Sequence, residues 1–142
     1  MNSPIRSFRD LDAWDAAMAL AVNCYRLAKS LPLEERFELS AQMRRAAVSV
    51  PSNIAEGHAA GTDGLFARHV RISLGSLGEL GTQLEVAVRA GLLRRADVAD
   101  VSRQLVRTTQ LVHGLARSIR MRRLKKIQAA GAVIVLVVIS LL

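Results

Sequence analysis

The stretch QMRRAAVSVPSNIAEG, from Gln42 to Gly57, decides the fold of this chain. Its apolar residues recur every three or four positions, a spacing typical of one buried helix face, yet Pro51 stands in the middle. A proline inside a helix removes one backbone hydrogen bond, and it lowers the stability of a solvent-exposed helix by about 3 kcal/mol relative to alanine. The apolar register from Leu39 to Gly57 is the same on both sides of Pro51. We therefore predict one helix, kinked at Pro51, rather than two.

Three further segments carry a helical pattern. The first covers residues 9–29 and begins after a capping-box-like pair, Ser7 and Asp10. Another runs from about 65 to 90, and an a/d heptad pattern over 98–119 marks the last. Long amphipathic helices with short connections predict an all-α, antiparallel up-down four-helix bundle.

Composition agrees with a single helical domain. The 142 residues can enclose one core, and they are 51% hydrophobic but only 4% aromatic. Cys24 is the only cysteine, so no intrachain disulfide can form, which fits a reducing compartment. The N-terminal residues MNSPIRSFRD contain no apolar segment of the kind found in a signal peptide. We expect a cytoplasmic protein.

Positive charge is concentrated near the C-terminus. Residues 117–126, RSIRMRRLKK, hold six of the 20 Lys and Arg residues and no acid. The net charge of +8 therefore belongs mainly to this run, and the rest of the chain is close to neutral. The sequence divides into a bundle over residues 1–120 and a basic then apolar tail over residues 121–142.

Three motifs resemble a known family: FRDLDAW, QMRRAAVSVPSNIAEG and SLGELGTQLEVAVRAGLL. In order and spacing they look like the four-helix-bundle proteins encoded in 23S ribosomal RNA intervening sequences, over residues 8 to about 120. That family is similar in fold to the accessory variability protein of diversity-generating retroelements, a basic pentamer that binds a reverse transcriptase and nucleic acid. The resemblance implies a homopentamer, and it implies no catalytic activity.

The chain departs from the family pattern at three places. Gly78 stands where a larger residue is usual, and Gly81 where a polar or acidic one is common. After about Arg120 the chain continues where typical members stop, so what the family implies does not extend to residues 121–142.

Polar residues accompany the apolar stripe around Pro51. We predict a structural polar network, with Arg44 or Arg45 paired to Glu79 or Glu56 on a neighbouring helix, because buried polar groups need partners. A polar binding strip is the alternative interpretation. The predicted members are Arg44, Arg45, Ser49, Ser52, Asn53, Glu56 and Glu79.

No residue pattern points to catalysis or to a cofactor. His58, His69 and His113 are scattered and have no metal-ligand spacing, so we expect no metal. Cys24 has no neighbouring histidine and is interpreted as a packed thiol rather than a nucleophile. We predict that the protein is not an enzyme and binds no cofactor.

The basic run and the tail leave two functions open. Nucleic-acid phosphates or lipid headgroups would be contacted by Arg117, Arg120, Arg122, Arg123, Lys125 and Lys126. The main hypothesis is a homo-oligomeric adaptor that binds RNA, DNA or a nucleic-acid enzyme. The alternative is an assembly protein tethered at the inner face of the membrane through residues 127–142, which are uncharged. The basic run could also be an ordinary solvated helix end. The tail could instead pack within an oligomer, extend the fourth helix as a plug, or be an extension of the reading frame.

Overall fold

The computed structural model describes residues 5–140, and the side chains of residues 5–130. Four helices pack together: α1 (Asp12–Ala28), α2 (Leu39–Ala59), α3 (Asp63–Arg89) and α4 (Arg95–Ser140). Short 3-10 helices, η1 (Phe8–Asp10) and η2 (Leu33–Arg36), precede α1 and α2, and the described residues contain no strand. The predicted all-α four-helix bundle is confirmed.

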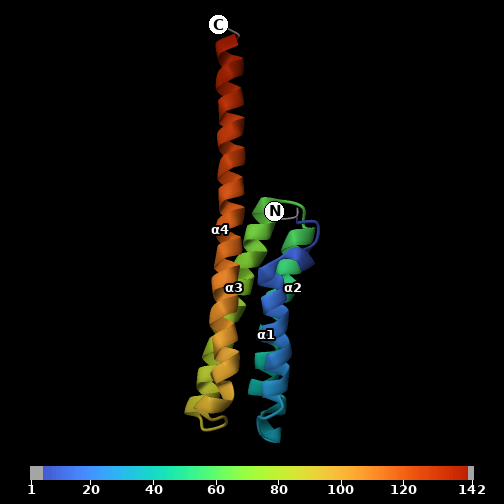
Figure 1. Cartoon of the computed structure of the whole chain (residues 1–142), viewed down its shortest axis with the longest axis vertical. Helices are drawn as coiled ribbons and strands as arrows, with labels where there is room; N and C mark the ends of the chain where they lie inside the picture. The colour runs from blue at the N-terminus through green and yellow to red at the C-terminus, as the bar shows by residue number, and fades with distance from the viewer. Residues whose placement is uncertain (1–4, 141–142) are drawn as a thin grey trace.

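Each helix packs on two neighbours, so that the bundle closes around one core. α2 contacts α1 and α3, and α4 contacts α3 and α1, as Figure 1 shows for the lower part of the molecule. The largest fully buried side chains include Leu20 of α1, Met43 and Ile54 of α2, Leu80 of α3 and Ile119 of α4. Met43, Ile54, Leu80 and Ile119 lie on the apolar stripes that the sequence marks on their helices. On α1 the apolar spacing predicts that Met18, Val22 and Tyr25 face inward, and this prediction is wrong, because α1 buries a neighbouring face that carries Leu20 and leaves these three side chains exposed.

Helix ends follow local rules. Ser7 and Asp10 form the expected capping box, but it caps η1, and α1 begins one residue after Leu11. Thr62 caps α3, where its hydroxyl accepts a hydrogen bond from the Leu65 backbone N–H. Gly61, with φ of +75°, allows the tight turn between α2 and α3 that a side chain would disfavour.

α2 continues through Pro51 as one helix of 21 residues. Val50, Pro51 and Ile54 are all buried, so the packing that the stripe provides offsets the hydrogen bond that the proline removes. The prediction of a single helix is confirmed, whereas a kink at Pro51 stays a prediction.

Replacing Pro51 with alanine is expected to leave the fold helical and to change the free energy of unfolding by less than about 1 kcal/mol, in the stabilising direction. Alanine supplies the missing N–H inside a helix that is already continuous. Circular dichroism during urea unfolding measures both helicity and stability. A clear loss of helicity at low urea would contradict this prediction, because it would show that α2 needs the ring of Pro51 to keep its native backbone geometry.

α4 is far longer than the bundle needs. Its last buried residue among the described side chains is Ile119, and residues 120–130 are all exposed. The helix continues without a break beyond the ends of its neighbours (Figure 1). The heptad pattern marks where the buried stripe stops, but it does not indicate that the helix itself goes on to Ser140.

Candidate functional site

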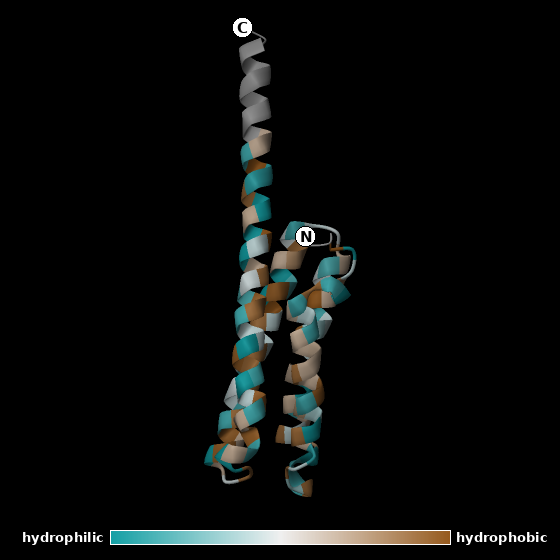
Figure 2. Cartoon of the chain, in the orientation of Figure 1, coloured by the Kyte–Doolittle hydropathy of each residue, from teal (hydrophilic) through white to brown (hydrophobic). Residues whose placement is uncertain are grey.

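The basic run lies on the part of α4 that leaves the bundle. Figure 2 shows mostly hydrophilic residues on this part of the helix, below the grey end. Two of the six basic side chains form ion pairs with Asp63 in the bundle. Lys126 Nζ lies 2.7 Å from Asp63 Oδ2, and Arg122 Nη2 lies 3.3 Å from Asp63 Oδ1. Asp63 is the first residue of α3, where the helix dipole also favours a carboxylate.

These contacts anchor α4 at the point where it leaves the bundle. The hydrogen bond from Lys126 is the main reason why the pKa of the Asp63 carboxyl lies below its ordinary value of 3.8, and the charge of Arg122 acts in the same direction. A lowered folded-state pKa stabilises the ionised form, so the contribution is present above the ordinary pKa and is lost as pH falls through the folded value. At neutral pH the anchor is therefore intact.

The other four basic side chains form no ion pair with Asp63 in the described part of the chain, although the charge of Arg123 also lowers the Asp63 pKa. Arg117, Arg120, Arg123 and Lys125 are exposed, and none has an ion-pair partner among the residues with described side chains. Arg117, Arg120 and Arg123 recur every three residues, so they lie along one side of the helix. No acidic residue follows Asp100 in the sequence, so α4 itself contributes no negative charge to this side.

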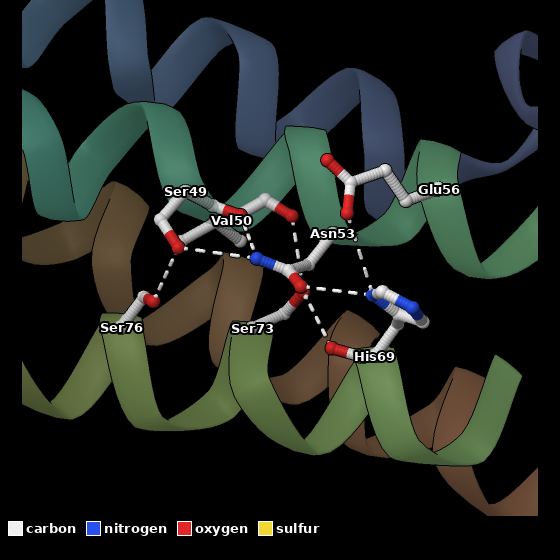
Figure 3. A network of polar contacts seen from close by, with 7 residues as sticks. All are labelled: Ser49, Val50, Asn53, Glu56, His69, Ser73 and Ser76. Carbon is white, nitrogen blue, oxygen red and sulfur yellow. Dashed lines mark hydrogen bonds and ion pairs between the residues drawn. The ribbon is translucent and has the colours of Figure 1, made fainter. Parts of the chain in front are cut away.

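A second polar cluster joins α2 to α3 beside Pro51 (Figure 3). The Asn53 amide donates to the Ser49 carbonyl oxygen at 2.9 Å and to Ser49 Oγ at 3.2 Å. Asn53 Oδ1 lies 3.0 Å from His69 Nδ1, and Ser76 Oγ donates to Ser49 Oγ at 2.8 Å. Asn53 therefore holds hydrogen bonds to both helices at once.

Ser73 and His69 complete this cluster. The buried Ser73 hydroxyl donates to the Val50 carbonyl oxygen at 3.0 Å, directly before Pro51. Glu56 Oε2 lies 3.6 Å from His69 Nδ1, so this nitrogen faces two oxygen atoms, one from Glu56 and one from Asn53. Each side chain of the cluster has at least one polar partner within the chain, an arrangement that fixes how α2 packs on α3.

The structure brings together only some of the predicted network. Ser49, Asn53 and Glu56 lie in this cluster, whereas Ser52 makes no side-chain hydrogen bond within the described part of the chain. The expected partners also differ. Neither Arg44 nor Arg45 pairs with Glu79 or Glu56 within residues 5–130, since Arg44 donates to the Arg36 carbonyl oxygen and Glu79 accepts from Gln83.

Sequence reasoning missed the α3 side of the cluster. His69, Ser73 and Ser76 are spaced by four and three residues, and they share the face that carries buried Phe66 and Leu77. Polar residues on an apolar helical stripe are the signal that was available, because buried polar groups require hydrogen-bond partners.

Catalytic and metal chemistry find no support in the described residues. No group of three or more His, Cys, Asp or Glu side chains lies close enough to hold a metal ion within that part of the chain. Cys24 is fully buried among apolar side chains, and this burial raises the pKa of its thiol to about 12. Such a thiol stays protonated at neutral pH and is a poor nucleophile.

Membrane insertion was the second function that the sequence left open. None of the helices, over the residues described, is long and apolar enough to cross a membrane. The predicted membrane contact through residues 127–142 depends mainly on side chains that lie outside the described residues.

Comparisons with known proteins identify the fold and the family of this chain. The crystal structure of a protein of unknown function from the S23 ribosomal protein family of Bacteroides thetaiotaomicron matches with a TM-score of 0.69 and 24% identity. The match covers 74% of this chain and 95% of that protein, so the two share a fold. No curated protein matches this chain. The family model described as 23S rRNA-intervening sequence protein matches residues 9–114. The chain therefore belongs to the 23S rRNA-intervening sequence protein family.

Proposed function

We propose that this protein is a non-enzymatic, homo-oligomeric adaptor that binds nucleic acid through the basic part of α4. The observation that carries the proposal is the strip formed by Arg117, Arg120 and Arg123, three exposed cations on one side of a helix with no acid nearby in sequence. Guanidinium groups at this spacing can contact successive phosphates, which gives affinity without base specificity.

Oligomerisation would multiply these contacts. Several strips held in one assembly bind a single strand with an effective concentration far above that of free subunits. The resemblance to pentameric bundles supports an assembly of five subunits, and a nucleic-acid enzyme bound on the same strand is the kind of partner that such an adaptor would bring to its template. Light scattering on the full-length protein is expected to give a mass close to five times 15.4 kDa. A monomer mass at micromolar concentration would contradict this part of the proposal.

Nucleic-acid binding has its own test. Replacing Arg117, Arg120 and Arg123 together with glutamine is expected to weaken binding to labelled single-stranded RNA and to duplex DNA at least tenfold, almost independently of base sequence. The magnitude of the slope of log affinity against log salt should fall by about 2 to 3 for each subunit that contacts the strand, since each phosphate contact contributes about 0.7 to 0.9. Fluorescence anisotropy over a series of salt concentrations measures both quantities.

A matched variant controls for the loss of charge. Glutamine at Arg45, Arg68 and Arg71, which are also exposed, removes the same charge from the bundle and leaves the strip intact. Binding close to that of the unmodified protein is expected for this control. Equal weakening by both triple variants would show that net charge, and not the strip on α4, attracts the nucleic acid.

A further inference from the structure

An apolar groove of about 640 Å³ runs along α1 and α2 on the outside of the bundle. Its walls include Met18, Val22 and Tyr25 of α1 and Val48 of α2, which are 38%, 45%, 45% and 40% exposed. Leaving a continuous apolar surface of this kind in water is unfavourable, and such surfaces mark sites of contact with another apolar surface.

The floor of the groove suits a helix. Ala21, Ala55 and Pro51 line it with small or compact side chains between the larger walls. A helix with branched apolar side chains can therefore approach closely and place a ridge between α1 and α2.

Charge restricts the occupant further. Among the described residues, the charged ones in the lining are Arg9, Arg26 and Lys29, with no acid. A basic helix would be repelled here, whereas an uncharged helix brings no charge that must be desolvated.

The same chain contains a segment with these properties. Residues 127–140 carry no charge and consist mainly of Ala, Val, Ile and Leu. They belong to α4, whose backbone is helical to Ser140, so this segment is about 20 Å long at about 1.5 Å per residue. The groove extends along α1 from Trp14 to Lys29, which is about 22 Å by the same measure. Segment and groove therefore match in length.

The segment does not reach the groove of its own subunit. The contacts of Asp63 with Arg122 and Lys126 hold α4 in line just before Ile127, and the helix runs on away from α1 and α2 (Figure 1). Folding back would require a break in a helix that is continuous from Arg95 to Ser140. A second copy of the chain is free of this restriction.

We propose that residues 127–140 of one subunit pack in the α1–α2 groove of another copy of this chain. This inference rests on the homo-oligomeric part of the proposed function, and it gives the uncharged segment a partner inside the assembly. The basic strip, which directly precedes the segment, would then lie at a subunit boundary, where strips from two copies act on one strand.

Disulfide trapping between two different full-length chains tests the contact. One chain carries Val22→Cys in the groove and an affinity tag, and the other carries Val135→Cys in the segment. After coexpression and mild oxidation, most of the tagged protein is expected as a disulfide-linked dimer on a non-reducing gel. The buried Cys24 thiol stays in both chains, and its lack of reaction is checked in the unmodified protein.

The control moves the acceptor cysteine out of the groove. Val86→Cys on α3 has similar exposure, 48%, and is expected to give at most a tenth of the cross-linked product. Equal cross-linking at Val22 and Val86, or none at Val22 while light scattering still shows an oligomer, would overturn the groove contact and leave the proposed assembly intact. A monomer mass would overturn both. Sedimentation of the full-length protein with vesicles of neutral and anionic lipids, without the Val22 cross-link, would assign the segment to a membrane surface and overturn the inference.

Discussion

Replacing Gly57 with alanine is expected to lower the free energy of unfolding by about 2 kcal/mol, because it overpacks the crossing of α2 and α3. A Cβ atom at position 57 would lie 2.7 Å from His69 Cβ and 2.8 Å from Phe66 Cδ2. It would also lie 3.3 Å from the Phe66 Cα, so part of the clash is with backbone that cannot rotate away. The short turn at Gly61 and Thr62 prevents the two helices from separating at this end.

Gly75→Ala is the matched control on α3. No heavy atom lies within 4 Å of a Cβ placed there, so alanine removes backbone freedom from the unfolded chain without a clash. It is expected to stabilise the protein by about 0.5 to 1 kcal/mol. Urea unfolding of both variants, followed by circular dichroism, gives the two values. Equal stabilisation by both alanines would mean that α2 and α3 cross less closely than these distances indicate.

Asn53→Leu is expected to destabilise the protein by about 2 to 3 kcal/mol, although leucine is apolar and of similar size. The side-chain amide of Asn53 joins Ser49 on α2 to His69 on α3. Leucine at this position would leave the half-buried His69 Nδ1 with only the Glu56 carboxylate as a partner, at 3.6 Å. Removing one partner of a buried hydrogen bond costs more than the bond itself contributes, because the other partner loses water without compensation.

Ser52→Ala, one residue earlier on α2, is the control. Its hydroxyl has no side-chain hydrogen bond within the described residues, so a change within about 0.5 kcal/mol is expected. A double-mutant cycle with Asn53→Ala and His69→Ala should give a coupling of about 0.5 to 2 kcal/mol. Additive effects of these two alanines would show that the Asn53–His69 contact contributes nothing of its own.

The bundle could be predicted from the sequence because its helices carry regular apolar stripes. Leu39, Met43, Val50 and Ile54 mark the buried face of α2 on both sides of Pro51, and the structure buries all of them except Leu39, which is half-buried. The hydrophobic effect is the dominant favourable term in folding and has no directional requirement. A pattern of apolar spacing is therefore enough to indicate which face of a helix is buried.

Partners of polar residues could not be predicted in this way. Glu56 meets His69 rather than an arginine, and Arg44 reaches back to the Arg36 carbonyl oxygen. Hydrogen bonds depend on distances of a few tenths of an ångström between elements that are far apart in sequence, and helical spacing carries no such information. The anchor of α4 on Asp63 was missed for the same reason, since 63 residues separate Asp63 from Lys126.

The order in which the helices pack has a consequence for how the chain folds. α1 with α2, α2 with α3, and α3 with α4 are neighbours in sequence, and each pair closes over a short connection at a small cost in loop entropy. Among the packed helix pairs in the described part of the chain, α1 and α4 alone are distant in sequence, and their hydrogen bonds from Thr108 to Ala16 and from Asn23 to Gln104 span 92 and 81 residues. Most of the native topology is therefore local, which favours rapid folding. The seam between the first and last helices of the bundle closes the longest loop, so it carries the largest entropic cost among the helix contacts of the subunit.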